Sequence, residues 1–210
     1  MKIKSFFYIA FSVLISFNSL AQNKERKFKI HTLAFYNLEN LFDTINDVNK
    51  NDEASPIMEI KFNRGNIYKQ KITNMARVIS EIGYDVTNRP PTIIGICEVE
   101  NRNVVEDLIA NEKLSKYNYG IVHYDSPDRR GIDVGLLYNK DIFKVINSNS
   151  HVLYINYNNT SDRSYTRDQL VVSGKLDGEL IHLIVNHWPS RGADETKRMA
   201  AAEVNNNIID

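Results

Sequence analysis

Residues 92–100 read TIIGICEVE and predict the central strand of the fold. The first six residues form an unbroken apolar run, which is typical of a strand buried on both faces of a sheet. The run ends in Glu98-Val99-Glu100. Residues at strand ends are held rigidly at the edge of the core, so this segment also indicates where a functional site could be built.

Upstream of this strand, the sequence predicts another strand over residues 28–36 and then a long polar stretch over residues 43–65. A loop of that length is uncommon in an ordered domain unless it is functional or flexible. Residues 67–82 carry apolar side chains at helical spacing and precede Gly83, a typical helix stop. We therefore expect an amphipathic helix there.

Downstream, a short helix is expected over residues 104–110, followed by a β-rich segment and a final helix over residues 195–209. The expected strands cover residues 119–124, 132–138, 143–157 (as one or two strands), 169–176 and 179–185. Asp177-Gly178 joins the last two and is a strong hairpin signal, because a type I′ turn needs positive φ at both positions. Parallel-type and hairpin-type strands mixed with helices predict an α/β (α+β) layered sandwich in one domain, residues 22–210.

Residues 1–21 have the pattern of a secretory signal peptide. Lys2 and Lys4 precede an apolar stretch over residues 6–17, and Ser19-Leu20-Ala21 places small residues at an expected cleavage site before Gln22. An uncleaved anchor is the alternative, but the apolar stretch is shorter than a membrane-spanning helix needs. We expect an exported protein, periplasmic or secreted, without stable membrane insertion.

The composition excludes several classes of protein. Lys and Arg total 26, as do Asp and Glu, and 42% of residues are hydrophobic. This is globular composition, and the balanced charge argues against a strongly basic nucleic-acid binder. Cys97 is the only cysteine in the sequence, which excludes a disulfide framework and a cysteine-based zinc site.

Three polar residues follow apolar strands: Asn37, Glu98 and His187. A carboxylate and an amide oxygen are hard ligands suited to Mg²⁺ or Mn²⁺, and an imidazole can transfer a proton or bind a phosphate oxygen. Guanidinium groups bind phosphate bidentately. The nearby loops carry Arg129, Arg130, Arg167 and Arg191. Together these groups suit the hydrolysis of a phosphate ester.

Five blocks occur in a fixed order: FYNLENLFD at 35–43, IGICEV at 94–99, RGIDVGLLY at 130–138, YTRD at 165–168 and VNHWPSR at 185–191. Each block alone is a weak signal. In this order they resemble the endonuclease/exonuclease/phosphatase superfamily, whose members include deoxyribonucleases, inositol polyphosphate phosphatases and neutral sphingomyelinases. The resemblance implies a layered α/β-β/α sandwich of the deoxyribonuclease type.

The resemblance also implies roles for single residues. Glu98 is the expected Mg²⁺ (or Mn²⁺) ligand, and Asn37 helps to position the metal or the phosphate. His187 stabilises the scissile phosphate or protonates the leaving oxygen. Asp133 is either the carboxylate that supports His187 or a structural residue.

Arginines are the expected substrate contacts. Arg167 corresponds to a phosphate-contacting arginine of the deoxyribonucleases, and Arg130 and Arg191 are further substrate-binding candidates. Two glutamates close to the site in sequence have lesser expected roles. Glu39 is expected, at most, to contact the residues that form the site and not the metal or the substrate. Glu100 is expected to start the following helix, where a carboxylate faces the positive end of the helix dipole.

The family's later Gly-Asp-x-Asn and Ser-Asp-His blocks are not found after His187. We therefore expect the N-terminal part of a longer enzyme, incomplete at the C-terminus and inactive as residues 22–210 alone. The leading expectation is an exported metal-dependent phosphoesterase of the endonuclease type acting on nucleic acid. A phosphatase or phospholipid phosphodiesterase on the same fold, and a non-catalytic phosphate-binding module, are alternatives. A further alternative is a secreted domain without any functional site. The sequence does not fix the oligomeric state.

Overall fold

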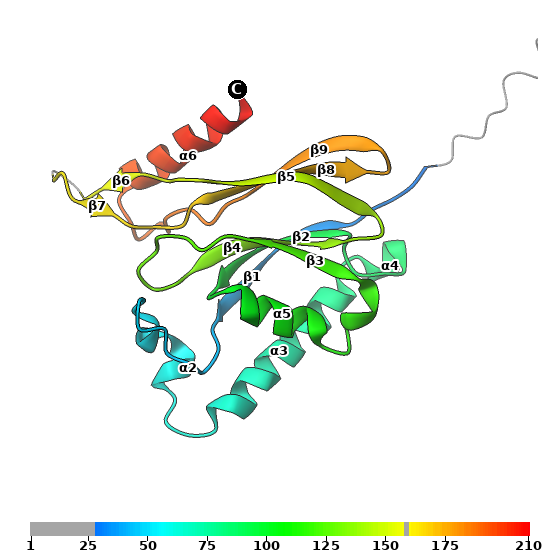
Figure 1. The fold of residues 1–210 in the computed structure, drawn as a ribbon, viewed down its shortest axis with the longest axis horizontal. Helices are drawn as coiled ribbons and strands as arrows, with labels where there is room; N and C mark the ends of the chain where they lie inside the picture. Colours follow the sequence, from blue (N-terminus) through cyan, green and yellow to red (C-terminus); the bar gives the residue numbers. More distant parts are fainter. Residues whose placement is uncertain (1–27, 158–159) are drawn as a thin grey trace, which may run out of the picture. The chain divides into compact units, whose positions relative to one another are not determined.

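A mixed four-stranded sheet carries the N-terminal half of the site (Figure 1). The computed structural model describes residues 28–157 and 160–210, so the predicted signal peptide lies outside the described residues. The strand order is β1-β2-β4-β3, with β1 at Leu33–Leu41, β2 at Ile93–Val99, β3 at Tyr119–His123 and β4 at Asp133–Asn139. β1 and β2 are parallel, and the other pairs are antiparallel. β2 is buried except at Glu98, which confirms the predicted central strand.

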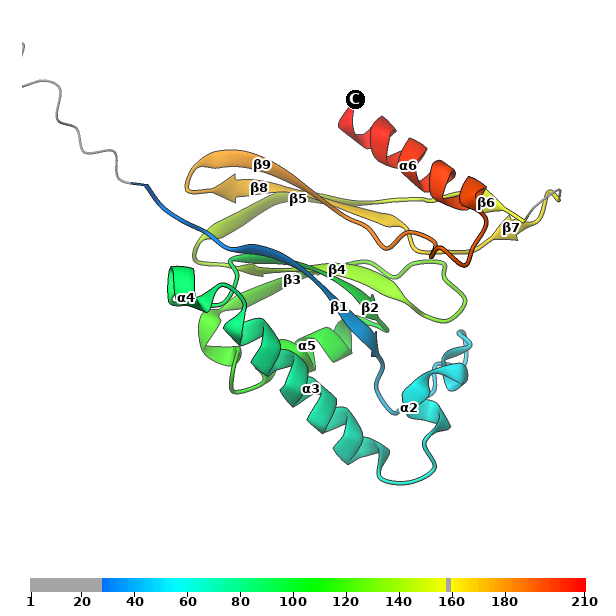
Figure 2. The ribbon, with the colours of Figure 1, turned by 180° about the vertical axis from the view of Figure 1, so that it is seen from behind.

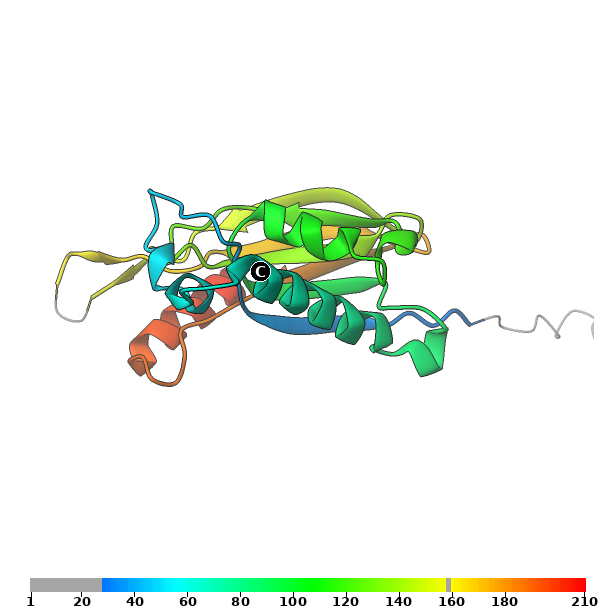
Figure 3. The same cartoon turned by 90° about the horizontal axis from the view of Figure 1, so that it is seen from below.

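Two helices cover one face of this sheet, α3 (Arg64–Glu81) and α5 (Arg102–Ala110). They lie along the same face when the fold is seen from below (Figure 3). Their buried side chains pack against the sheet in one apolar cluster, which includes Ile72, Met75, Ile79, Val104 and Leu108 from the helices and Ile94, Ile96 and Leu137 from the strands. Burial of such side chains is the main stabilising term of the layer.

A three-stranded antiparallel sheet packs on the opposite face, in the order β5-β8-β9. β5 spans Phe143–His151, β8 Gln169–Leu176 and β9 Glu179–Val185. Between the sheets lies a second apolar cluster, including Ile93, Cys97 and Leu136 from one side and Phe143, Val172 and Val185 from the other. The turn between β8 and β9 has positive φ at Asp177 (52°) and Gly178 (95°), as predicted. The layered sandwich expected from the sequence is confirmed.

The remaining elements gather at one end of this second sheet. A short hairpin of β6 (Ile155–Asn156) and β7 (Arg163–Ser164) projects there, and α6 (Glu195–Ile209) lies beside it on the sheet's outer face (Figures 1 and 2). Leu153, Ile155 and Ala201 form a small apolar cluster that joins the two. The predicted stretch 143–157 is thus divided between β5 and β6.

The polar stretch at residues 43–65 is more ordered than the sequence predicted. It contains a 3₁₀ turn, η1 (Asp52–Ala54), and a one-turn helix, α2 (Pro56–Glu59). Ile57 packs against Phe42 and Ile132, which fastens the segment to the ends of β1 and β4. Two other short elements complete the described fold, α4 (Tyr84–Thr87) and η2 (Ser115–Tyr117). Within the described residues, no helix is both long and apolar enough to cross a membrane.

Candidate functional site

The ends of β1 and β2 are irregular, and this irregularity builds the site. Glu39, Asn40 and Glu98 all have positive φ, at 52°, 56° and 59°. The strand register shifts between Asn37 and Leu41 on β1, and between Cys97 and Val99 on β2. Left-handed conformations of residues other than glycine are unfavourable and concentrate at functional sites, and a bulge re-aims the side chain it carries. Here the bulge on β2 turns Glu98 out of an otherwise buried strand.

The Glu98 carboxylate is the centre of the arrangement. Its Oε1 accepts a hydrogen bond from Nδ2 of Asn37 at 2.9 Å, and its Oε2 accepts one from the backbone N–H of Asn40 at 3.0 Å. Nε2 of His187 lies 3.4 Å from Oε1. The structure therefore brings together Asn37, Glu98 and His187 from three separate segments. Asn37 and Glu98 lie within the bulged strand ends, rather than beyond them as the sequence indicated.

Lys71 on α3 fixes the bulge of β1 from the helical side. Its Nζ donates to the carbonyl oxygen of Asn40 at 2.9 Å and also to that of Glu39. Burial lowers the pKa of Lys71, and the charges of Glu39 and Glu98 oppose this shift. Nothing in the sequence singles out this residue, because a single lysine on the polar side of a helix is an ordinary surface feature.

His187 is held in a partly buried position after β9. Burial lowers the pKa of its imidazole, and the positive charge of Arg167 adds to the effect, so the neutral ring is favoured near neutral pH. Within the described structure, its Nδ1 atom is buried and has no hydrogen-bond partner. The ring thus presents Nε2 to Glu98.

Arg167 holds the backbone of this turn. Its Nε donates to the carbonyl oxygen of His187 at 3.0 Å, and its Nη2 donates to that of Trp188 at 3.0 Å. Its Nη1 pairs with Asp128 at 3.2 Å, and the residue is only 8% exposed. Arg167, which the sequence predicted to contact a phosphate, thus directs three of its nitrogen donors to groups of the protein itself.

Asp128 joins two of the predicted arginines. Its carboxylate accepts from Nε and Nη2 of Arg130, both at 3.1 Å, and from Arg167. Burial alone would raise the pKa of Asp128, but the hydrogen bonds and charges of the two arginines outweigh it, and the pKa is lowered. Asp128 is 3% exposed, yet it lies in a polar loop whose sequence carries no apolar signal for burial.

The predicted support of His187 by Asp133 is not what the structure shows. One oxygen of Asp133 lies 3.0 Å from Nε2 of His123, and the other accepts from the backbone N–H of Ser126 at 2.8 Å. Asp133 thus fastens the loop between β3 and β4, in agreement with its structural alternative. Arg191 is exposed, and in the described part of the chain no hydrogen bond or ion pair links it to the other site residues.

Glu100 does not start the following helix. Asn101 caps α5, because its side chain accepts from the backbone N–H groups of Asn103 and Val104. The Glu100 carboxylate instead accepts from the backbone N–H of Asp43 at 2.7 Å. Burial raises the pKa of Glu100 to about 7, and it is placed to fasten the loop after β1.

The donor set at Glu98 fits a hard divalent cation. It offers the Glu98 carboxylate, whose ion-pair partner within the described residues is a histidine rather than a lysine or arginine. Asn37 turns its Nδ2 toward this carboxylate, while its Oδ1 accepts from the backbone N–H of Glu39 at 2.7 Å, so Asn37 orients Glu98 rather than offering an oxygen to the cation. A second group, His123, Asp125 and Asp133, places its ligand atoms within 4.8 Å of one another. In that group, however, His123 and Asp133 already face each other as a pair.

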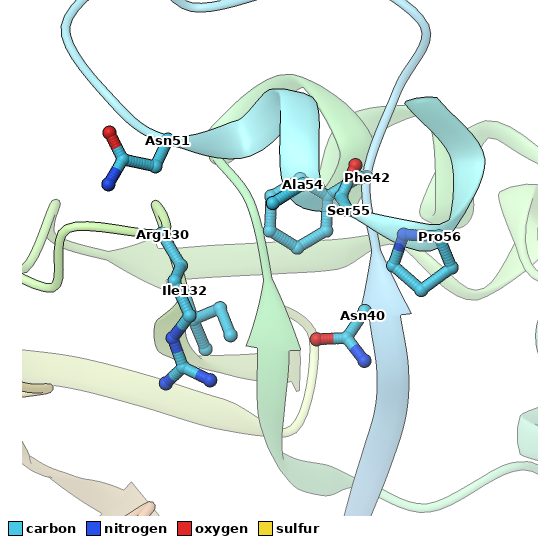
Figure 4. A pocket seen from close by; sticks show the side chains of 8 residues that line it. All are labelled: Asn40, Phe42, Asn51, Ala54, Ser55, Pro56, Arg130 and Ile132. Atoms are coloured by element: carbon cyan, nitrogen blue, oxygen red, sulfur yellow. The ribbon is translucent and has the colours of Figure 1, made fainter. Parts of the chain in front are cut away.

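A cavity of about 180 Å³ adjoins the site (Figure 4). Arg130 and Asn40 enter it from opposite sides. The cavity therefore extends from Asn40, whose backbone N–H binds Glu98, to Arg130, whose guanidinium binds Asp128. Its lining is completed by Phe42, Asn51, Ala54, Ser55, Pro56 and Ile132.

A model of the Endonuclease/Exonuclease/phosphatase family matches residues 32–210. The chain is similar to the solved structure of an endonuclease/exonuclease/phosphatase from Bacteroides vulgatus, with 17% identity and a TM-score of 0.53 over 84% of this chain and 58% of that one. A mannosyl-6-phosphatase from Bacteroides thetaiotaomicron has 14% identity and a TM-score of 0.51, over 86% and 59%.

A more distant structure is TDP2 from D. rerio in complex with a single-strand DNA product, with 16% identity, a TM-score of 0.46, and coverage of 66% of this chain and 48% of that one. No curated protein matches the chain. The chain spans 58% and 48% of the lengths of the first two solved structures that it matches.

Proposed function

Because this chain belongs to the endonuclease/exonuclease/phosphatase family, we propose that it carries the metal-binding part of an exported phosphodiesterase that cleaves nucleic acid. The single observation that carries the proposal is the convergence of Asn37 and His187 on the Glu98 carboxylate. The activity of the whole protein belongs to the proposal, since the chain spans less than two thirds of the solved structures named above.

Glu98 would hold the cation, Mg²⁺ or Mn²⁺, and Asn37 would help to position it by orienting the Glu98 carboxylate. The ion would supply positive charge against a phosphate oxygen when bound. The chain's own contribution is placement: a bulged strand, a backbone N–H from Asn40 and an amide from Asn37 fix the carboxylate before any substrate arrives. Such fixed geometry lowers the reorganisation that the reaction would otherwise require.

His187 would act on the scissile phosphate directly. Its Nε2 lies beside Glu98, whereas the other ring nitrogen, Nδ1, is buried and has no hydrogen-bond partner in the described structure. From this position the neutral ring, with its proton on Nε2, can donate a hydrogen bond to a phosphate oxygen, and the imidazolium form, which the lowered pKa makes the minor one near neutral pH, can pass a proton to the leaving oxygen. We assign Arg167 a positioning role, because its donors hold the carbonyl groups of His187 and Trp188.

Arg130 is the better candidate for a direct phosphate contact. Its side chain is 56% exposed and lines the cavity beside Asn40. Its pairing with Asp128 fixes the orientation of the guanidinium without burying it. Arg191 is exposed on the loop after β9, where it could meet a longer substrate.

A second candidate function is hydrolysis of a sugar phosphomonoester. It is favoured by the likeness to the mannosyl-6-phosphatase structure, which covers 86% of this chain. At 14% identity this likeness shows the fold and leaves the substrate to be measured.

Hydrolysis assays on the protein expressed from its whole gene test the proposal. With Mn²⁺ or Mg²⁺ we expect cleavage of a single-stranded oligonucleotide, and His187→Gln should lower kcat by at least about 100-fold, as expected for a lost acid or base. His182→Gln is the matched control, because His182 is exposed on β9 and pairs with Ser173.

Equal rates in the two histidine variants would contradict the assigned role of His187. Turnover of mannose 6-phosphate without turnover of the oligonucleotide would replace the leading function with the second candidate.

A further inference from the structure

A second cavity, of about 280 Å³, shares Arg130 with the cavity drawn in Figure 4. It is enclosed by the loop between β3 and β4, the β6–β7 hairpin, the turn after β9 and the start of α6. Arg167, Pro189 and Ser190 line it, and Arg167 also holds the carbonyl oxygen of His187. The cavity is therefore continuous with the structure that supports the reaction centre.

The charges around this cavity are unbalanced. Four cationic side chains line it, and Asp128 is the carboxylate among its lining residues. That carboxylate is already shared between Arg130 and Arg167. The charges of Arg129 and Lys197 therefore have no carboxylate partner in the cavity wall.

Aromatic rings hold these two cations in place. Arg129 lies over the ring of Tyr165 at 5.3 Å, and Lys197 lies over the ring of Tyr157 at 5.2 Å. Arg163 approaches the same Tyr165 ring at 4.9 Å, which adds a third positive charge close by. Nζ of Lys197 also donates to Oγ of Ser164 at 3.4 Å. A cation held over a ring face keeps its charge and further N–H groups for an oxyanion.

The tyrosines also remain accessible. Tyr157 is 44% exposed and Tyr165 is 42% exposed, so neither ring is used up by the protein core. Cationic groups interleaved with exposed rings are the pattern by which proteins hold single-stranded nucleic acid, because the cations follow the phosphates and the rings stack on bases.

We propose that this cavity binds a backbone phosphate of a single nucleic-acid strand, next to the phosphate at the reaction centre. Arg129 and Lys197 would supply the contacts, and Arg130 would lie between the two phosphate positions. The inference rests on the proposed function, because it extends the substrate of that site from one phosphate to a strand.

The test measures binding of a fluorescein-labelled oligothymidine to the full chain in EDTA, where no divalent ion contributes. The variant R129Q/K197Q removes both cations of the cavity. R77Q/K116Q is the charge-matched control, because Arg77 pairs with Glu81 on α3 and Lys116 lies over the ring of Tyr117 at 5.1 Å, both outside the cavity lining.

We expect the plot of log affinity against log salt concentration to become less steep by about 1.4 in R129Q/K197Q, since each lost contact with a single strand removes about 0.7. The control variant should keep the slope of the wild-type chain. Equal slopes in all three proteins, or equal losses in both variants, would overturn the proposal. Full displacement of the oligothymidine by inorganic pyrophosphate at equal phosphate concentration would overturn the assignment to a strand.

The two proposals fail separately. Binding of the oligothymidine can depend on Arg129 and Lys197 as expected while Mn²⁺ binding does not depend on Glu98. In that case the proposal for the cavity is supported and the proposed metal site is wrong. If Mn²⁺ binding depends on Glu98 but the salt slopes are equal, the metal site stands and the cavity proposal fails.

Discussion

Asp128 has the largest number of fixed charged partners among the described site residues. It binds Arg130 through two side-chain nitrogens and holds Arg167, which in turn holds the backbone of His187. Removing this carboxylate would leave the buried guanidinium of Arg167 without its counter-charge. Breaking one side of a buried ion pair is costly, because the remaining charge keeps its desolvation penalty.

We therefore predict that Asp128→Asn lowers the free energy of unfolding by about 3 kcal/mol at pH 7, measured by urea denaturation. Asp125→Asn, in the same loop but with a side chain 82% exposed, is the control and should change stability by less than about 0.5 kcal/mol. A loss of similar size in both variants would contradict the bridging role of Asp128.

The pairing of the Asp128 carboxylate with its two arginines also predicts how the free energy of unfolding depends on pH. The pKa of Asp128 is lowered in the folded chain, so its contribution is present above the unfolded pKa of about 3.9 and is lost as the pH falls through the folded value. The stability difference between the wild type and Asp128→Asn should therefore shrink below about pH 4. A difference that stays constant from pH 7 to pH 3 would show that the charge is not its cause.

At the scale of the elements, the strongly patterned segments could be predicted from the sequence. β8, β9 and α6 have the bounds that alternation, the Asp177-Gly178 turn and helical spacing indicated. The bulges could not be predicted, because positive φ at Glu39 and Glu98 has no signature in a residue type that favours other conformations, and Asn40 alone, although asparagine tolerates positive φ, does not indicate a bulge. The short helices in residues 43–65 were missed for a related reason, since they depend on the burial of Ile57.

The close pairing of β5 with β8 depends on a glycine. A Cβ atom at Gly174 would collide with the ring of Phe143 and would lie 2.7 Å from the carbonyl oxygen of Lys144. Phe143 is fully buried between the sheets and packs edge-on against Tyr138. We predict that Gly174→Ala destabilises the fold by about 1–3 kcal/mol in urea denaturation.

Gly65→Ala is the matched control for this change. A Cβ atom at Gly65 has no neighbour within 4 Å, and the residue lies in the first turn of α3. Alanine there should stabilise the chain by up to about 1 kcal/mol. A stabilising Gly174→Ala would show that the Phe143 ring and the neighbouring backbone of β5 can shift to admit a methyl group.

At the scale of the whole molecule, the site combines segments that are far apart in the chain. β1, β2, the loop before β4 and the turn after β9 each contribute one or more residues. The sequence identified Asn37, Glu98 and His187 through their place in ordered blocks. It could not assign partners, because whether Asp133 meets His123 or His187 depends on how the two sheets stack.

Export is a prediction for the whole chain. If residues 1–21 are a signal peptide, the protein expressed with this segment in a Gram-negative host should be recovered from the periplasm with Gln22 as its first residue. N-terminal sequencing measures this directly. Recovery from the cytoplasm or the membrane fraction with Met1 or Lys2 retained would contradict it.

The central claim is that Glu98 is the metal ligand of this site, and Mn²⁺ binding followed by electron paramagnetic resonance tests it most directly. Asp125→Asn serves as the control for the group formed with His123 and Asp133. We predict that Glu98→Gln weakens Mn²⁺ binding at least about tenfold, whereas Asp125→Asn leaves it unchanged. Unchanged binding in Glu98→Gln, or its loss in Asp125→Asn, would contradict the account.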